Sequence, residues 1–145
     1  PGKLDAREWE TMKEHTRIGH EILSKSNAPI FKLAAEIALR HHEKWDGSGY
    51  PDALVGEMIP ESARIVAIAD VFDALTMKRP YKEAWPIERT MATMRESSGS
   101  HFDPHLFERF AEILPRILSI KLEWEARESA SAEPHANDQS KQEMG

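Results

Sequence analysis

The segment Glu61–Thr76, ESARIVAIADVFDALT, constrains the fold more than any other part of the sequence. Between residues 63 and 75 its only charged side chains are Arg64, Asp70 and Asp73. A helix that is apolar on most sides is typical of the centre of a helical domain. No long stretch of the chain alternates apolar and polar residues, so strands are not expected. The sequence therefore predicts an all-α fold built around this helix.

Apolar residues at helical spacing predict about five helices in all. Asp5 and Glu8 form a capping-box pattern for the first helix, which should run to about Lys25. Asp103 is expected to cap the fifth helix, and Pro115 to kink or end it, so that the segment after Pro115 is separate. In chain order the expected helices begin near Asp5, Pro29, Glu61, Pro86 and Pro104.

The composition indicates one domain over residues 1–125 and a tail after it. The chain has 145 residues, 40% of them hydrophobic, which allows a core of ordinary size. Residues 126–145 have no large apolar residue except Met144, so we expect a disordered tail there.

The charge and the residue types exclude several classes of function. A formal charge of −6 makes a broad DNA-binding surface unexpected. No apolar run has the length of a membrane span, and the first residues do not form a signal peptide. The chain has no cysteine, which fits a cytoplasmic protein and leaves imidazole and carboxylate as the only ligands for a transition metal.

Four residues of these two types come from three predicted helices. His15 lies on the apolar face of the first helix, and His41 and His42 extend the apolar face of the second at its C-terminal end. Asp70 belongs to the central helix, where a buried carboxylate is costly unless it is paired or bound to a metal. Helix bundles build metal sites from such inward-facing ligands. The set can hold one or two ions of iron, manganese or zinc, and two ions suit phosphodiester cleavage.

Each of these four residues also has a structural interpretation. A single histidine such as His15 is more often a hydrogen-bonded core residue than a ligand. His41 and His42 can interact with the helix dipole at a C-terminal end. Asp70 can form a buried ion pair, with Arg64 as the candidate partner.

Two acidic residues leave alternatives open, and three further histidines have one expected place each. Asp73 can orient a ligand histidine or cap a loop. Glu43 can be a ligand or an exposed residue at a helix end. His20 is expected on the surface, and His101 and His105, at a helix start, are expected to be structural.

Two further segments carry residues suited to a phosphate-containing ligand. In GSGYP, Gly47 and Gly49 allow positive φ or close backbone approach, and Tyr50 offers a ring for stacking on a base or ribose. In TMKRPYK, Arg79 and Lys82 follow the helix that carries Asp70. Arginine contacts phosphate in a bidentate manner and lysine as a point charge. An ordinary turn and a solvated basic loop are the structural alternatives.

Together these segments resemble the HD-GYP domain, a branch of the HD metal-dependent phosphohydrolase superfamily that hydrolyses cyclic di-GMP. The matching segments are PGKLDAREWETMKEHTRIGHEIL, HHEKWDGSGYP, IPESARIVAIADVFDALTMKRPYK and HFDPHLFERF, within residues 1–112. The resemblance implies an HD-domain-like helical bundle with two or three iron or manganese ions in a complete domain. It also implies that a metal-bridging hydroxide attacks phosphorus and that the products are linear pGpG or GMP.

The resemblance assigns roles residue by residue. It implies that the metal ligands are His15, His41, His42 and Asp70, that the nucleotide contacts are Gly49, Tyr50, Arg79 and Lys82, and that Asp46 and Asp73 brace the ligands or the loop. It further implies an N-terminal receiver or sensory domain in a response regulator, with diguanylate cyclase (GGDEF) domains as partners.

One motif of the family does not occur here. The sequence has no adjacent His-Asp pair, which in the family precedes the segment that matches Pro1. The resemblance therefore predicts the C-terminal part of an HD-GYP domain, without its N-terminal helices. Two hypotheses remain: a cyclic di-GMP phosphodiesterase, and a catalytically incomplete module that binds nucleotide or a partner protein without turnover. A helical metalloprotein acting on another phosphate ester is a third, disfavoured by Gly49-Tyr50-Pro51 and the RPYK segment.

Overall fold

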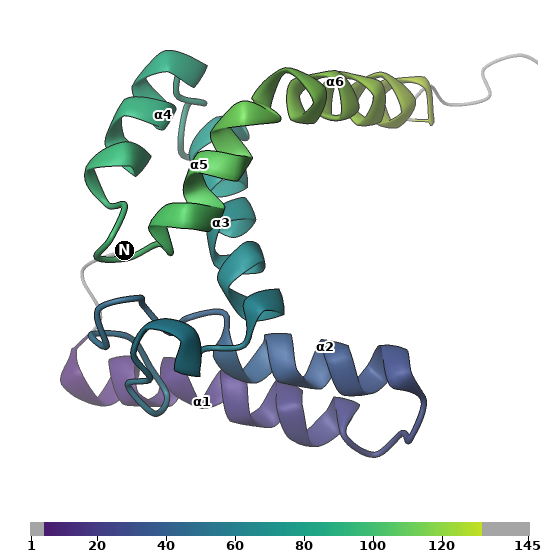
Figure 1. Cartoon of the computed structure of the whole chain (residues 1–145). Helices are drawn as coiled ribbons and strands as arrows, with labels where there is room; N and C mark the ends of the chain where they lie inside the picture. Colours follow the sequence, from purple (N-terminus) through teal and green to yellow (C-terminus); the bar gives the residue numbers. More distant parts are fainter. Residues whose placement is uncertain (1–4, 132–145) are drawn as a thin grey trace, which may run out of the picture. The chain divides into compact units, whose positions relative to one another are not determined.

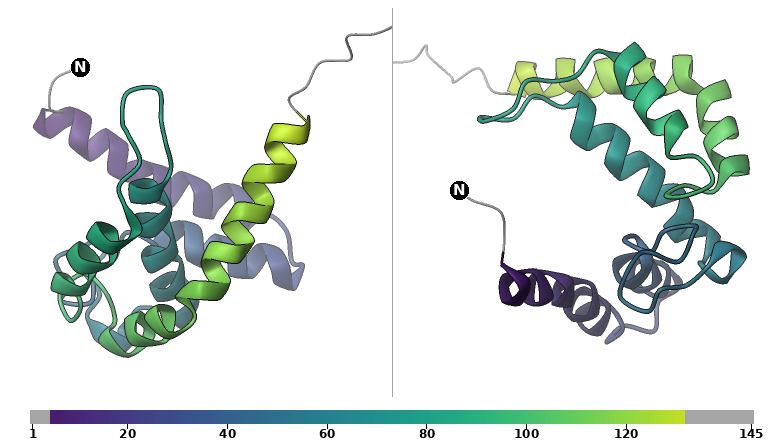
Figure 2. Two further views of the ribbon diagram at one scale, coloured as in Figure 1. Left: turned by 90° about the horizontal axis from the view of Figure 1, so that it is seen from above. Right: turned by 90° about the vertical axis from the view of Figure 1, so that its left-hand side faces the viewer.

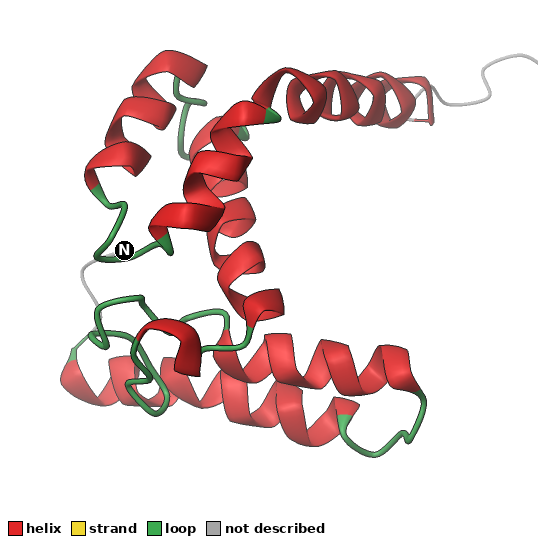
Figure 3. Ribbon diagram, in the orientation of Figure 1, coloured by secondary structure: helices red, strands yellow, loops and turns green. Residues whose placement is uncertain are grey.

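The structure is a computed structural model that describes residues 5–131. The chain divides into two compact units, Pro1–Ala111 and Glu112–Gly145. The described residues are helical, and they contain isolated β-bridges in place of extended strands (Figures 1 and 3). None of the helices in this part of the chain is long and apolar enough to cross a membrane.

The predicted all-α class is confirmed. In chain order the helices are α1 (Ala6–Leu23), α2 (Pro29–Arg40), the 3-10 helix η1 (Gly56–Met58), α3 (Glu61–Thr76), α4 (Ile87–Glu96), α5 (Pro104–Glu112) and α6 (Leu114–Ser131). The Asp5 side chain accepts hydrogen bonds from the backbone of Arg7 and Glu8 at the start of α1, and the Glu8 side chain completes the predicted capping box. Pro115 lies in the first turn of α6, so the segment after it is separate, as predicted.

Helices α1 and α2 lie side by side in the first unit (Figure 1). Small residues bring them close: Thr16 and Ala35 are buried, and a β-carbon added at Gly19 would lie 3.3 Å from that of Ala38. Close approach of two backbones excludes bulky side chains from the contact. The helix pair is therefore held by its small residues.

The larger apolar residues of α1 and α2 occupy a different face, which corrects our expectation. Helical spacing places Trp9, Met12, Ile22 and Ile30 on the apolar faces of these helices, which predicts burial, but they are 43%, 43%, 60% and 67% exposed. Periodicity identifies an apolar face, but it does not say which neighbour covers that face.

Helix α3 is the centre of the core of the first unit. It buries Ala67, Ile68 and Phe72, and the other fully buried apolar side chains include Met94 of α4 and Phe107 of α5. The expectation of a central helix is therefore right for this face of α3.

The predicted tail begins too early. Residues 126–131 belong to α6. Ala126, Arg127 and Glu128 are strong helix formers, so a polar segment continues the helix without needing a core. The remainder of the expected tail, residues 132–145, lies outside the described residues.

Candidate metal centre

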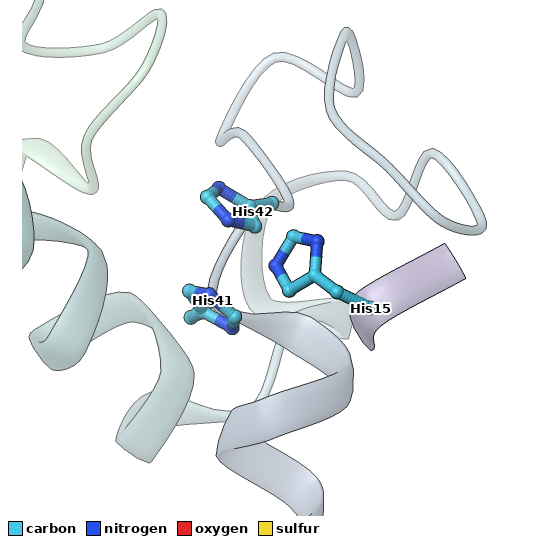
Figure 4. A group of neighbouring side chains, drawn as sticks. All are labelled: His15, His41 and His42. Atoms are coloured by element: carbon cyan, nitrogen blue, oxygen red, sulfur yellow. The ribbon is translucent and has the colours of Figure 1, made fainter. Parts of the chain in front are cut away.

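Three of the four predicted ligands meet at the end of α2. His15 projects from α1, and His41 and His42 follow Arg40 at the C-terminal end of α2 (Figure 4). One ring nitrogen of each histidine lies within 4.8 Å of those of the other two. The ring centroids of His41 and His42 are 4.0 Å apart, and that of His15 lies 5.0 Å from His42. Three imidazoles at such distances can bind one divalent ion.

Backbone carbonyls orient two of the rings. Nδ1 of His41 lies 3.0 Å from the Ile37 carbonyl oxygen, and Nδ1 of His15 contacts the Met12 carbonyl oxygen. Because a carbonyl only accepts, Nδ1 carries the proton in these contacts, and Nε2 is the nitrogen that can face a metal. A carbonyl bond of this kind is how proteins orient metal-binding histidines.

His42 has the most perturbed electrostatics of the three. The pKa of His42 is lowered from 6.5 to about 4. Burial is the largest cause, and the neighbouring rings of His41 and His15 add to it. At neutral pH His42 is therefore the neutral form that can bind a metal.

Asp70 is not one of the three clustered ligands, and it differs from the expectation of a buried carboxylate. Its side chain is exposed on α3. Its negative charge nevertheless acts on His42 and opposes part of the lowering of the pKa of that ring. The suggested Asp70–Arg64 pair is also wrong, because Arg64 Nη1 lies 2.5 Å from Asp103 Oδ2. His15 is exposed as well, whereas we expected it to point inward.

The glycine loop turns back directly onto the histidines. The Tyr50 N–H donates to the His42 carbonyl oxygen at 3.1 Å, and the Tyr50 ring stacks on the His42 ring at 4.8 Å. A β-carbon on Gly49 would lie 2.5 Å from the same carbonyl oxygen. Gly49 is thus required by its own backbone neighbours, whereas Gly47 has positive φ, at 83°.

Glu43 is a buried anchor for this loop that both sequence-based alternatives missed. It is 2% exposed, and its carboxylate accepts hydrogen bonds from the N–H groups of Asp52 and Leu54, at 2.9 and 3.0 Å. Arg40 Nη1 lies 3.3 Å from Glu43 and also bonds Asp52, whose other oxygen accepts from Arg17 at 2.8 Å. The loop is therefore tied to both α1 and α2. The adjacent HHE letters placed Glu43 beside the ligands but did not show that it turns into the loop.

The remaining acidic residues differ in role. Asp46 accepts hydrogen bonds from the backbone and hydroxyl of Ser48, which lowers the pKa of the Asp46 carboxyl. This contact braces the loop. Asp73 is exposed on α3.

The other histidines include one correction. His20 is half-buried against α2, with Nδ1 3.1 Å from the Ala35 carbonyl oxygen, because the α1–α2 contact lies beside the face that carries His15. His101 is half-buried and stacks on Phe102, and burial lowers the pKa of its ring. His105 follows the Asp103 cap at the start of α5.

Arg79 and Lys82 lie apart from the histidines in the chain, in a turn beyond the C-terminal end of α3. The two residues exchange backbone hydrogen bonds of 2.9 and 3.1 Å, which close the turn. Both views of Figure 2 show this segment projecting to the same side of α3 as the N-terminal half of α1. Both side chains are exposed.

Comparison with known proteins agrees with the sequence motifs. The sequence profile of the HD domain matches residues 1–106. The cyclic di-GMP phosphodiesterase response regulator RpfG of Xanthomonas campestris is 58% identical over 104 residues, which are 72% of this chain and 28% of RpfG. A 3'3'-cGAMP-specific phosphodiesterase 2 of Vibrio cholerae is 50% identical over 121 residues, 83% of this chain and 23% of the relative.

A solved structure gives the same result for the fold. The cyclic GMP-AMP-specific phosphodiesterase V-cGAP3 of V. cholerae superposes with a TM-score of 0.62 at 27% identity, over 79% of this chain and 27% of that one. This chain spans between 23% and 28% of the two sequence relatives above. The histidine cluster, the helical fold and the profile match together place the chain in the HD domain family, as a member of its HD-GYP type.

Proposed function

We propose that this chain is part of a metal-dependent phosphodiesterase domain that hydrolyses cyclic di-GMP to linear pGpG or GMP. The observation that carries the proposal is the convergence of His15, His41 and His42, whose ligand atoms lie within 4.8 Å of one another. The relatives named above act, by their names, on cyclic di-GMP or 3'3'-cGAMP, which supports a cyclic dinucleotide as substrate.

The residues at the site fit divalent metal ions, because imidazole and carboxylate ligands suit iron, manganese or zinc. Iron or manganese is the proposed choice, as the resemblance to the HD-GYP domain implies. His15, His41 and His42 would hold an ion through ring nitrogens, and Asp70 adds a carboxylate whose charge already reaches His42. Two or three ions are expected in a complete domain. Bound ions supply Lewis-acid activation of water and of the phosphodiester.

The residues of the chain have distinct tasks toward the nucleotide. Tyr50 stacks on His42 and so holds that ring in place, while its exposed portion offers a surface to a base. Arg79 and Lys82 bind phosphate oxygens from the turn after α3. Asp46 braces the loop, and Asp73 orients a ligand histidine or caps a loop.

A second function, binding without turnover, is favoured by one observation. The 145 residues contain no adjacent His-Asp pair, so these residues provide three clustered imidazoles and one nearby carboxylate. Such a module would bind the nucleotide or a partner such as a diguanylate cyclase domain. An N-terminal receiver domain is the proposed regulatory partner, since RpfG is by name a response regulator.

The test measures binding and turnover separately. Cyclic di-GMP and 3'3'-cGAMP are each added to the chain, and to the longest protein that its gene encodes, with Mn²⁺ or Fe²⁺ under anaerobic conditions. Hydrolysis that disappears in His41→Ala and His42→Ala, together with lost metal, supports the phosphodiesterase. Nucleotide binding without product in any form supports the second function. Absence of both binding and product contradicts the two proposals.

A further inference from the structure

Trp85 joins the turn that carries Arg79 and Lys82 to two helices. Its backbone N–H donates to the Leu75 carbonyl oxygen in the last turn of α3, at 2.8 Å. Pro86, the next residue, is the N-cap of α4. The half-buried indole therefore lies between the end of the turn and the start of α4.

Two cations lie over the indole ring. The guanidinium carbon of Arg89, from the first turn of α4, is 3.9 Å from the ring centroid, and Nζ of Lys82 is 5.6 Å from it. Both distances are within about 6 Å, the range in which a cation is attracted to the face of an aromatic ring. The arrangement gives the otherwise exposed Lys82 ammonium group one favoured position.

The charges around the turn leave that ammonium group available to an anion. The neighbouring carboxylate, Glu83, lies 3.7 Å from Lys78 Nζ. The ring contact of Lys82 is electrostatic and does not neutralise its charge. A lysine side chain has four rotatable bonds. Because the ring contact restricts them before a ligand arrives, ligand binding costs less conformational entropy.

We propose that Trp85 is a positioning residue for phosphate recognition: its indole orients the Lys82 ammonium group, next to the point where the backbone joins the turn to α3, while Arg89 holds the indole in place. The inference rests on the proposed function, in which Lys82 contacts a phosphate of the cyclic dinucleotide. It adds a residue outside the RPYK segment to the site and predicts that its effect passes through Lys82.

The test measures KM and kcat of Trp85→Leu in the form of the protein that hydrolyses cyclic di-GMP. If the protein binds the nucleotide without turnover, the test measures Kd instead. We expect KM or Kd to rise about fivefold to tenfold with kcat within twofold, because the lost contact acts on binding. Trp85→Phe should recover most of the affinity, since it keeps a ring for the cation. In a Lys82→Met background, Trp85→Leu should add no further loss. An additive loss, or an equal fall in kcat, would overturn the proposal.

A measurement without nucleotide separates this inference from the proposed function. The ring current of Trp85 should shift the ε-methylene proton resonances of Lys82, and the shift should vanish in Trp85→Leu and persist in Trp85→Phe. The Lys82 amide, which donates to Arg79, should exchange faster in Trp85→Leu. If the wild type binds no cyclic dinucleotide, the proposed function fails, and these spectra still decide whether Trp85 holds Lys82. Unchanged resonances and unchanged exchange refute the positioning role itself.

Discussion

Replacing Glu43 with alanine should remove the buried carboxylate that anchors the glycine loop, while the ion pairs of Asp52 with Arg17 and Arg40 remain. The carboxylate is 2% exposed and accepts three contacts, from the backbone of Asp52, the backbone of Leu54 and the guanidinium of Arg40. Alanine removes the acceptor and leaves two part-buried N–H groups without it. Arg40 keeps Asp52 as a partner, so its charge is not left alone.

The expected loss follows from the two backbone groups. Each unsatisfied buried donor costs about 1–3 kcal/mol, so the pair gives about 2–6 kcal/mol. Local opening of the loop would let water reach both groups and places the effect near the lower end of that range. A loss of at least about 2 kcal/mol is large against the 5–15 kcal/mol that stabilises a typical domain.

The assay combines urea denaturation with amide hydrogen exchange. Glu43→Ala should lower the unfolding free energy by at least about 2 kcal/mol and speed exchange at Asp52 and Leu54. The matched control is Glu36→Ala on α2, whose carboxylate accepts from Ser62 at an exposed position; its loss should cost less than about 1 kcal/mol. A Glu43→Ala variant as stable as the control, with unchanged loop exchange, would refute the anchoring role.

Three further predictions concern the site. His15→Ala should reduce bound metal measured by elemental analysis, whereas His105→Ala, on the exposed side of α5, should leave it unchanged; equal metal in both variants would exclude His15 as a ligand. Gly49→Ala should cost about 1–3 kcal/mol in thermal unfolding, because the new methyl would lie 2.5 Å from the His42 carbonyl oxygen; an unaltered melting temperature would contradict this packing. His42 in metal-free protein should titrate near pH 4 in an NMR experiment, because burial and the rings of His41 and His15 disfavour its charged form. The unfolded chain then binds the proton more tightly, so this group lowers stability as the pH falls from 6.5 towards 4, and a midpoint at 6.5 or above would show that the ring is not buried as described.

Local chemistry explains which parts of the fold could be predicted from sequence. The capping box at Asp5 and the prolines at the starts of α2, α5 and α6 act over three or four residues, and each helix began where they indicated. The end of α6 was predicted less well. A polar composition indicates the lack of a core, but it does not stop residues with high helix propensity from continuing a helix.

The residues of the candidate site could be predicted from the sequence, but several of their contacts could not. Periodicity placed His15, His41 and His42 on helix faces, and the structure brings their ring nitrogens together. The same reasoning gave Asp70 a buried position and Arg64 as its partner, whereas Asp70 is exposed and Arg64 pairs with Asp103. Partners far apart in the chain depend on how the helices cross, and no spacing rule contains that information.

The helical class, the helix starts and the family follow from the order of residues alone, because caps, apolar periods and the HHE, GYP and RPYK motifs are local patterns. Three contacts become known only from the folded chain: Glu43 turns inward to hold the loop, Gly49 packs against the backbone of His42, and Lys82 and Arg89 lie over the Trp85 ring. These contacts arise when a loop folds back on its own helix or two helices meet. The bonds that a polar group or ring makes then depend on distance in space, and this distance is not encoded in residue spacing.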